Sequence, residues 1–300
     1  MGEPMKIAVI GAEGQVGRDA CAEFERNGDE VHGLNHSQLE IASPDSVEAA
    51  LWQIKPAVIV NTAAFHNVEH CEAEPAKAFV INACGARNLA KAAARLSALF
   101  IHLSTDYVFD GGKSTPYTET DLPRPLNAYG NSKLAGEYFV RSLSPRHFVL
   151  RTSALYGQHP CRAKGGLNFV ELMRKLGRER KEIKVVDSEF VTPTATVDLA
   201  KQIVKLSRCD SFGLYNATAE GSCSWHEFAQ EIFALTGTEA NLKIANATEF
   251  PGRVPRPHYS VLENQRLKAI GMNVFRPWQE GLREYLAKTN REVYAAQVSL

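Results

Sequence analysis

The chain has 300 residues, of which 44% are hydrophobic and 23% are charged, a composition typical of a folded protein rather than a disordered one. Its 34 basic and 34 acidic residues balance, so its overall charge gives it no attraction for nucleic acid or for a membrane surface. No run of 18 apolar residues and no signal-peptide pattern occurs, and we therefore expect a cytoplasmic protein.

The first half of the chain alternates short apolar runs with helical patterns. Strand-like runs lie at 5–10, 30–34, 57–60, 98–103 and 147–150, and helical patterns end near 26 or span about 43–54, 74–95 and 128–142. Strands that alternate with helices of this length indicate a parallel sheet covered on both faces. The pattern predicts a Rossmann-type doubly wound α/β fold, whose ligands bind at the carboxyl ends of the strands.

The alternation becomes less regular after about residue 155. Helical patterns follow at about 168–177, 195–207, 225–235 and 279–287, and strand-like runs lie at 183–186 and 213–216. We expect residues 1–155 to form the dinucleotide-binding domain, joined by returning segments near 183–216. Residues 156–182 and 217–300 would then form a smaller C-terminal substrate-binding part.

Three glycines lie where the first strand passes into the first helix, in the order Gly11-x-x-Gly14-x-x-Gly17. Glycines at such a turn let the backbone approach a pyrophosphate, and the helix N-terminus offers free N–H donors. The spacing resembles that of the extended short-chain dehydrogenases. We therefore expect Gly11, Gly14, Gln15, Val16 and Gly17 to hold a nicotinamide dinucleotide.

The second strand ends in Leu34-Asn-His-Ser37, without the carboxylate that bonds the ribose 2′-hydroxyl of NAD. Arg18, directly after the third glycine, and the polar His36 and Ser37 are suited to the 2′-phosphate of NADP. The sequence therefore favours NADPH as cofactor, with NADH tolerated.

Tyr129 and Lys133 are four residues apart at the start of a predicted helix, so phenol and ammonium share one face. A nearby ammonium favours the phenolate and brings its proton transfer toward neutral pH. Such a pair alone is also typical of a solvated helix turn. Upstream, however, a strand ends in Ser104 and Thr105, whose hydroxyls reach the edge of the sheet. We expect Thr105, Tyr129 and Lys133 to form the catalytic group, with Ser104 the less favoured hydroxyl.

Several stretches resemble the dTDP-4-dehydrorhamnose reductase family in the same order along nearly the whole chain. They include Val60-Asn-Thr-Ala-Ala64, Ser104-Thr-Asp-Tyr-Val-Phe-Asp110, Asn127-Ala-Tyr-Gly-Asn-Ser-Lys-Leu-Ala-Gly-Glu137 and Arg256-Pro-His-Tyr-Ser260. The resemblance implies reduction of the 4-keto group of dTDP-4-dehydro-L-rhamnose to give dTDP-L-rhamnose.

The same resemblance assigns roles to individual residues. It implies that Tyr129 gives a proton to the ketone oxygen, that Thr105 holds this oxygen, and that Lys133 bonds the nicotinamide ribose. It also implies that Glu40 and Ile41 lie beside the adenine, that Ala63 and Ala64 line the cofactor, and that Val68, Tyr107, Asn168 and Arg256 face the nucleotide sugar.

Two positions depart from the family pattern. Ala154 stands where the family usually has a tryptophan beside the sugar or base, and Val191 stands where it favours a glycine before Pro193-Thr. Because a large aromatic wall and a flexible glycine are both missing, we expect a differently shaped substrate pocket.

Other interpretations stay open. The regulatory subunit of methionine adenosyltransferase resembles the same reductases and binds dinucleotide without an established turnover. Epimerases and dehydratases of the extended family keep NAD and return the hydride, but dehydratases carry an Asp-Glu pair where Thr105 is followed here by Asp106-Tyr107. Neither the six scattered cysteines nor the nine histidines show metal-ligand spacing, so we expect no metal site. The family includes monomers and dimers, which leaves a homodimer open.

Overall fold

The computed structural model describes residues 3–161, 165–245, 249 and 253–298. Its centre is a six-stranded sheet in the order β10-β5-β4-β3-β1-β2, and every neighbouring pair is parallel. The order reverses between β1 and β3, which places the ligand crevice of a doubly wound sheet at their carboxyl ends. The strands are β1 (Lys6–Ile10), β2 (Glu30–Leu34), β3 (Val58–Asn61), β4 (Leu99–Thr105), β5 (His147–Thr152) and β10 (Gly213–Asn216).

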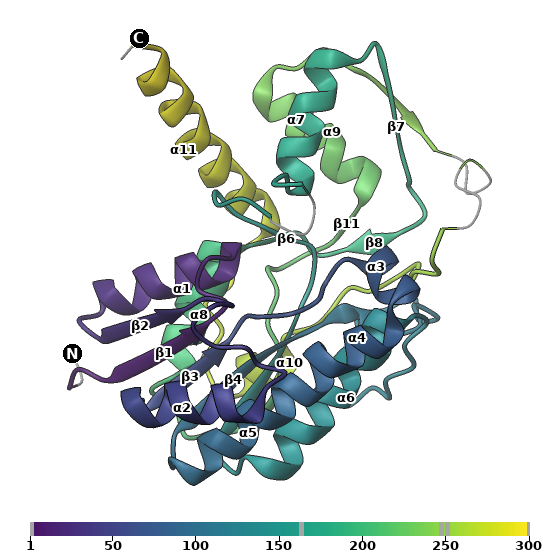
Figure 1. Cartoon of the computed structure of the whole chain (residues 1–300). Helices are drawn as coiled ribbons and strands as arrows, with labels where there is room; N and C mark the ends of the chain where they lie inside the picture. Colours follow the sequence, from purple (N-terminus) through teal and green to yellow (C-terminus); the bar gives the residue numbers. More distant parts are fainter. Residues whose placement is uncertain (1–2, 162–164, 246–248, 250–252, 299–300) are drawn as a thin grey trace.

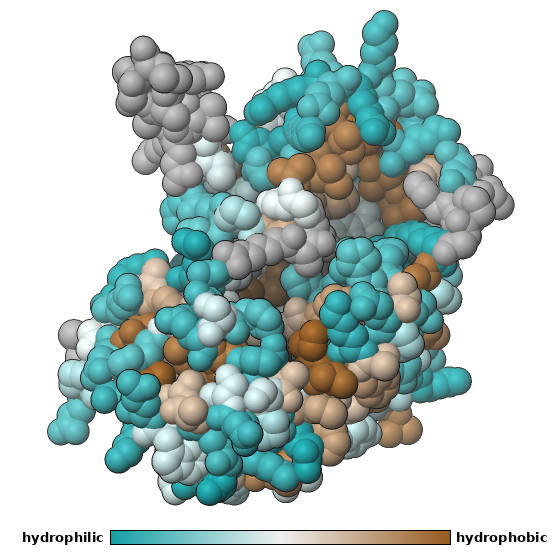
Figure 2. All heavy atoms as spheres, viewed as in Figure 1, coloured by the Kyte–Doolittle hydropathy of each residue, from teal (hydrophilic) through white to brown (hydrophobic). Residues whose placement is uncertain are grey.

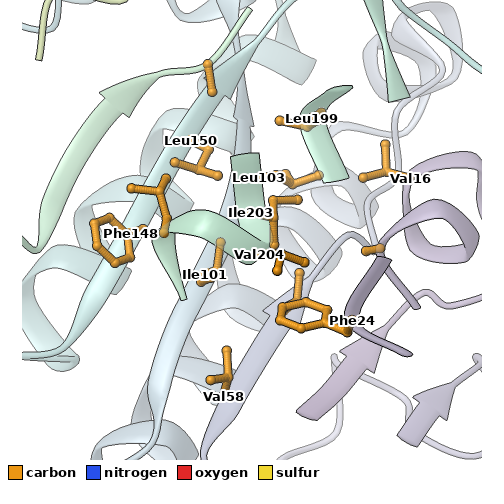
Figure 3. Packing of buried hydrophobic residues seen from close by; sticks show 14 of the residues in the cluster. Val16, Phe24, Val58, Ile101, Leu103, Phe148, Leu150, Leu199, Ile203 and Val204 are labelled. Atoms are coloured by element: carbon orange, nitrogen blue, oxygen red, sulfur yellow. The ribbon is translucent and has the colours of Figure 1, made fainter. Parts of the chain in front are cut away.

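Helices cover both faces of this sheet, so the predicted Rossmann-type fold is confirmed (Figure 1). On one face, α1 (Gln15–Arg26) and α8 (Thr196–Leu206) pack against the strands, and side chains such as Phe24 and Ile203 point at them (Figure 3). The opposite face is covered by α2 (Pro44–Ile54), α5 (Gly85–Arg95) and α6 (Ala128–Leu143). Alternate residues of β1 enter the two cores, as a strand buried on both sides requires.

A smaller unit packs beside the carboxyl ends of the strands (Figure 1). Its apolar core joins the two helices α7 (Phe169–Glu179) and α9 (Trp225–Thr236) to short strand pairs and to the start of α11 (Trp278–Val298). Figure 2 shows the face hollowed between the large and small parts, with hydrophobic side chains on the small part beside the hollow. The short strands are β6 (Leu155–Tyr156), β7 (Glu182–Val185), β8 (Phe190–Val191), β9 (Thr194–Ala195), β11 (Cys223–Ser224) and β12 (Asn241–Ile244).

The returning segments cross between the two parts in a finer pattern than the predicted ranges. Helix α8 and strand β10 join the large sheet, whereas β7 pairs with β12 in the smaller unit. Helix α10 (Gln265–Ala269) also returns, because Leu267 and Phe275 are buried in the core of the large sheet. Residues 217–300 are therefore not confined to the smaller part.

The long helix predicted for 74–95 is divided. Short helices α3 (Val68–Ala73) and α4 (Pro75–Phe79) lead into a π-helical turn, η1 (Val80–Cys84), which continues as α5. In η1, Asn82 donates to Ser132 Oγ on α6 at 2.9 Å and binds both backbone polar groups of Phe65. The wider turn is the kind that proteins place near functional sites. No helix among the residues described is long and apolar enough to cross a membrane.

Candidate active site

The glycine loop lies at the switch point between β1 and β3. Gly11 has φ +78° and donates its N–H to Leu34 O at 2.9 Å. A Cβ on Gly11 would lie 2.9 Å from both Ala63 N and Thr62 Oγ1, and one on Gly17 would lie 2.2 Å from Gly11 O. Only glycine therefore permits the close approach of β1, α1 and the segment after β3.

The N-terminus of α1 is suited to a phosphate group. Gly14 is the N-cap, no side chain caps the helix, and its first turn holds no acidic residue. Free N–H groups and the positive end of the helix dipole therefore face the crevice. The Gln15 side chain donates to Gly157 O at 3.0 Å and to His159 O at 2.7 Å, so it joins this helix to the segment after β6. These residues fit the pyrophosphate of a dinucleotide.

The predicted 2′-phosphate site contains one carboxylate, that of Glu13, that was not predicted from the sequence. Glu13, inside the glycine loop, accepts a hydrogen bond from Asn35 Nδ2 at 3.0 Å at the end of β2. Arg18 Nε donates to Glu13 O at 3.3 Å, and His36 lies 3.1 Å from a Glu40 carboxylate oxygen. Arg18 and the carboxylates of Glu13 and Glu40 thus lie on segments that meet at the end of β2.

The other predicted cofactor residues occupy separate places along the crevice. Ile41 is buried and packs against Gly85 of α5, and Ser37 donates to Asn35 Oδ1 at 2.7 Å. Ala63 N donates to Asn61 Oδ1 at 3.1 Å, directly after β3. Ala64 follows on the same segment, at the edge that the glycine loop approaches.

Thr105, Tyr129 and Lys133 meet at the carboxyl end of β4. Thr105 is the last residue of β4, while Tyr129 and Lys133 lie in the first two turns of α6. The start of α6 is fixed by its N-cap, Asn127, which accepts from Gly130 N at 2.9 Å and donates to Pro255 O at 2.9 Å. The Tyr129 phenol bonds the Thr105 hydroxyl. Thr105 and Tyr129 of the predicted group are therefore in contact, and Lys133 follows Tyr129 by one helical turn.

Lys133 is an almost fully buried ammonium. Its Nζ donates to Leu103 O at 2.6 Å and lies 3.5 Å from Nε2 of His102, which Asn61 Nδ2 contacts on the other ring nitrogen at 3.0 Å. Burial lowers the pKa of Lys133 to about 8, and the Glu137 carboxylate opposes this. Burial and Lys133 together lower the pKa of His102 well below its usual value, so His102 is neutral.

Glu137 is itself held by a buried ion pair one turn below Lys133. Arg151 donates to its two carboxylate oxygens at 2.9 and 2.7 Å, and Ser104 Oγ donates to it at 2.5 Å. Ser104 is thus bonded away from the crevice, which leaves Thr105 as the hydroxyl beside Tyr129. Burial raises the pKa of Tyr129, and the bond to Thr105 opposes the rise. The phenol is protonated at neutral pH and can donate a proton.

The predicted substrate residues fall into two groups. Tyr107 contacts the Tyr129 ring edge-on, with centroids 5.8 Å apart, and Arg256 pairs with Glu69, the neighbour of Val68 on α3. Arg256 Nε is buried and has no hydrogen-bond partner among the residues described. The Arg256–Glu69 pair thus joins the segment before Ser260 to α3.

Asn168 has a different setting. Its amide caps α7 by accepting from Glu171 N at 3.0 Å, and it donates to Gly157 O at 2.8 Å and to Tyr285 Oη at 3.2 Å. Both amide protons and the oxygen are therefore used within the protein. Ala154, where the family has tryptophan, adopts φ +44°, so the missing aromatic wall coincides with a left-handed turn.

Several site residues were not found from the sequence because their partners are distant along the chain. They are Glu13, Glu69, His102, Asp106, Ser153, Arg253 and Ser260. Only Asp106 carried a local signal, since it directly follows the predicted catalytic hydroxyl. Within the described part of the chain, no three His, Cys, Asp or Glu side chains are grouped as metal ligands.

Comparison with known proteins gives matches over both parts of the fold. Residues 5–291 match the family model for the RmlD substrate binding domain. The chain is similar to the spore coat polysaccharide biosynthesis protein SpsK of Bacillus subtilis, at 39% identity over 94% of this chain and 96% of that protein. It is also similar to the solved dTDP-4-dehydrorhamnose reductase of Clostridium acetobutylicum, at 40% identity, TM-score 0.91, and 95% and 100% coverage of the two chains.

A second solved structure adds a cofactor to the comparison. The dTDP-4-dehydrorhamnose reductase of Bacillus anthracis, solved in complex with NADP, is 36% identical with a TM-score of 0.90, over 95% of this chain and 99% of that one. All three matches include the smaller unit as well as the sheet. The likeness therefore extends beyond the general dinucleotide-binding fold.

Proposed function

Because the chain belongs to the family of the RmlD substrate binding domain, we propose that it is an NADPH-dependent reductase of dTDP-linked keto sugars. Its substrate is dTDP-4-dehydro-L-rhamnose and its product dTDP-L-rhamnose. The observation that carries the proposal is the protonated Tyr129 phenol, hydrogen-bonded to Thr105 and one turn before the buried Lys133. NADH serves as a weaker cofactor.

The chemistry follows from where these residues hold protons and charge. NADPH, when bound by the glycine loop and α1, supplies the hydride. Tyr129 transfers its phenolic proton to the oxygen of the reduced carbonyl, and Thr105 holds that oxygen next to the phenol. Lys133 places a positive charge beside the phenolate that forms, and Leu103 O and His102 fix its position.

Arg256 supports a nucleotide-linked substrate. Its Nε is buried and has no hydrogen-bond partner in the part of the chain that the structure describes, and its guanidinium pairs with an exposed carboxylate, Glu69. A planar guanidinium can bind two oxygens of a phosphate at once, whereas it shares a single oxygen with the exposed Glu69 carboxylate here. We infer that a diphosphate replaces Glu69 as its partner, and that Val68 and Tyr107 line the path to the sugar.

Purified protein is mixed with the keto sugar, and loss of NADPH or NADH absorbance is followed for the wild type, Tyr129→Phe and Tyr138→Phe. Tyr138 lies on the same helix and is 57% exposed, so it is the matched control. We expect cofactor consumption in the wild type and Tyr138→Phe, faster with NADPH, and a loss of at least about 100-fold in Tyr129→Phe. Consumption by Tyr129→Phe at the wild-type rate would contradict the assigned proton donor.

Product analysis separates the competing interpretations. An epimerase or dehydratase would convert the sugar without net consumption of NADPH and would retain NAD through purification. A regulatory protein would bind NADPH without converting any sugar. Either result would replace the proposed reduction.

A further inference from the structure

Asp106 is a buried carboxylate that accepts hydrogen bonds from three hydroxyl groups. It directly follows Thr105, in the short 3-10 helix η2 (Asp106–Val108). Thr105 Oγ1 donates to its Oδ1 at 3.0 Å, while Ser153 Oγ and Ser260 Oγ donate to its Oδ2 at 2.8 and 2.6 Å. Burial raises the pKa of Asp106, and the three hydroxyl donors oppose that rise. Every bond stabilises the ionised carboxylate.

The three hydroxyls come from separate segments around the crevice. Thr105 ends β4, Ser153 lies between β5 and the left-handed Ala154, and Ser260 follows Arg256 by four residues. Ser260 is itself fixed to the smaller unit, because its N–H donates to Phe190 O at 2.9 Å. Asp106 thus connects the reacting hydroxyl to both segments that border the substrate.

The hydrogen-bond directions set the orientation of Thr105. A hydroxyl has a single proton, and that of Thr105 is donated to Asp106. The oxygen of Thr105 is therefore an acceptor toward its other neighbours, the Tyr107 N–H at 3.2 Å and the Tyr129 phenol. A directed chain runs from Tyr129 through Thr105 to Asp106.

We propose that Asp106 is a positioning residue for the reduction: without touching the substrate, it fixes the direction of the Thr105 hydroxyl and thereby keeps the Tyr129 proton in place for transfer. This rests on the proposed function. When the substrate arrives, its carbonyl oxygen replaces Thr105 as acceptor of the phenolic proton, and the Thr105 hydroxyl turns its own proton from Asp106 to that oxygen. Because Ser260 donates a hydrogen bond to Asp106, this change of acceptor also depends on the position of the segment that carries Arg256 and Ser260.

The Asp106 charge also acts on the phenol directly. The charged or titratable groups that act on Tyr129 are Asp106 and Tyr107 on η2 and Cys71 on α3. Asp106 disfavours the phenolate, so a neutral residue at this position lowers the pKa of Tyr129. Reduction needs the protonated phenol, and the Asp106 charge therefore favours the state that donates the proton.

The first experiment measures kcat and KM for wild type, Asp106→Asn and Asp106→Glu. We expect kcat of Asp106→Asn to fall at least about tenfold, with KM for the keto sugar within about threefold, and Asp106→Glu, which keeps a carboxylate, to recover part of the loss. Ser153→Ala and Ser260→Ala remove one donor each and keep both the charge and the Thr105 bond, so their kcat should stay within about threefold of the wild type. A kcat of Asp106→Asn within about threefold of the wild type, or an equal fall in the serine variants, overturns the proposal.

A second experiment does not depend on turnover. Tyrosine is labelled isotopically, the Tyr129 signal is assigned with Tyr129→Phe, and its chemical shift is compared at neutral pH by NMR with and without NADP⁺. Asp106→Asn and Thr105→Val should each move this signal, whereas Ser153→Ala should leave it in place. If the wild type reduces no sugar, the proposed function fails, while these shifts still decide the role of Asp106. Should Asp106→Asn not fold, an unmoved signal in Thr105→Val alone overturns the proposal.

Discussion

Replacing Lys133 with methionine removes an ammonium that the fold buries almost completely. Burial lowers the pKa of Lys133 from 10.5 to about 8, against the opposing effect of Glu137. At about 1.4 kcal/mol per pKa unit, the protonated side chain destabilises the native state by about 3 kcal/mol relative to the unfolded chain. Methionine carries no charge and has a similar length, so it avoids this penalty.

The sign of the pH dependence follows from the two protonation states. Below about pH 8 both native and unfolded chains hold the Lys133 proton, and the penalty is complete. Between about pH 8 and 10.5 the unfolded chain binds more protons, so the free energy of unfolding of the wild type rises with pH. Methionine also leaves Leu103 O without the 2.6 Å hydrogen bond from Lys133, and this loss reduces the gain in stability by about 1 kcal/mol. We expect Lys133→Met to be about 2 kcal/mol more stable at neutral pH, with no advantage left near pH 10.

Urea unfolding at several pH values between neutrality and pH 10 measures this difference directly. The control is Lys91→Met, because Lys91 lies exposed on α5. The stability gap between the wild type and Lys133→Met should close with rising pH, whereas the gap to Lys91→Met should stay constant. A constant gap for Lys133→Met would refute the argument that its burial shifts its ionisation. Lys133→Met should also lose reductase activity. The variant would then show that Lys133 is needed for catalysis although it lowers the stability of the fold.

Three further predictions concern the loop and the buried ion pair. Gly11→Ala should abolish dinucleotide binding in calorimetry. Gly28 also has a positive φ, +83°, but a Cβ there would meet no described atom within 4 Å, so Gly28→Ala should bind normally. Equal losses of binding in the two variants would refute the close-approach argument. Glu137→Gln should lower the free energy of unfolding by about 3–5 kcal/mol in urea, because it leaves the Arg151 charge buried without a partner; a loss below about 1 kcal/mol would contradict this. Glu13→Gln should raise the ratio of kcat/KM for NADPH over NADH several-fold, and an unchanged ratio would place Glu13 away from the ribose.

The sheet could be predicted from sequence because its signals are local. The four inner strands are short, mostly apolar runs buried on both faces, and the predicted ends of all six strands agree with the observed ones within two residues. The carboxyl ends of such strands meet at one edge, which is why Thr105 and the glycine loop could be assigned to one crevice. The division of the predicted helix 74–95 was missed, because one extra residue in a π-turn leaves the helical pattern of apolar residues nearly unchanged.

The connections within the site could not be predicted, because they depend on packing between distant segments. Ser260 reaches Asp106 across 154 residues, and Arg256 reaches Glu69 across 187. No pattern of period two or 3.6 carries such information. Glu13 illustrates the same difficulty. The second strand ends without a carboxylate of its own, but the Glu13 carboxylate in the glycine loop accepts a hydrogen bond from Asn35 at the end of that strand.

Two buried carboxylates flank the reacting group, and they differ in whether a positive charge compensates them. Glu137, below Lys133, is neutralised by a bidentate bond from Arg151, whereas the side-chain donors to Asp106 in the described residues are three uncharged hydroxyls. Hydroxyls satisfy the oxygens of Asp106 without cancelling its charge, and a charge in a poorly hydrated interior acts strongly on its neighbours. That charge opposes ionisation of Tyr129. The resting site therefore holds its phenol as an acid, the state that reduction requires, whereas oxidation of an alcohol would require the phenolate.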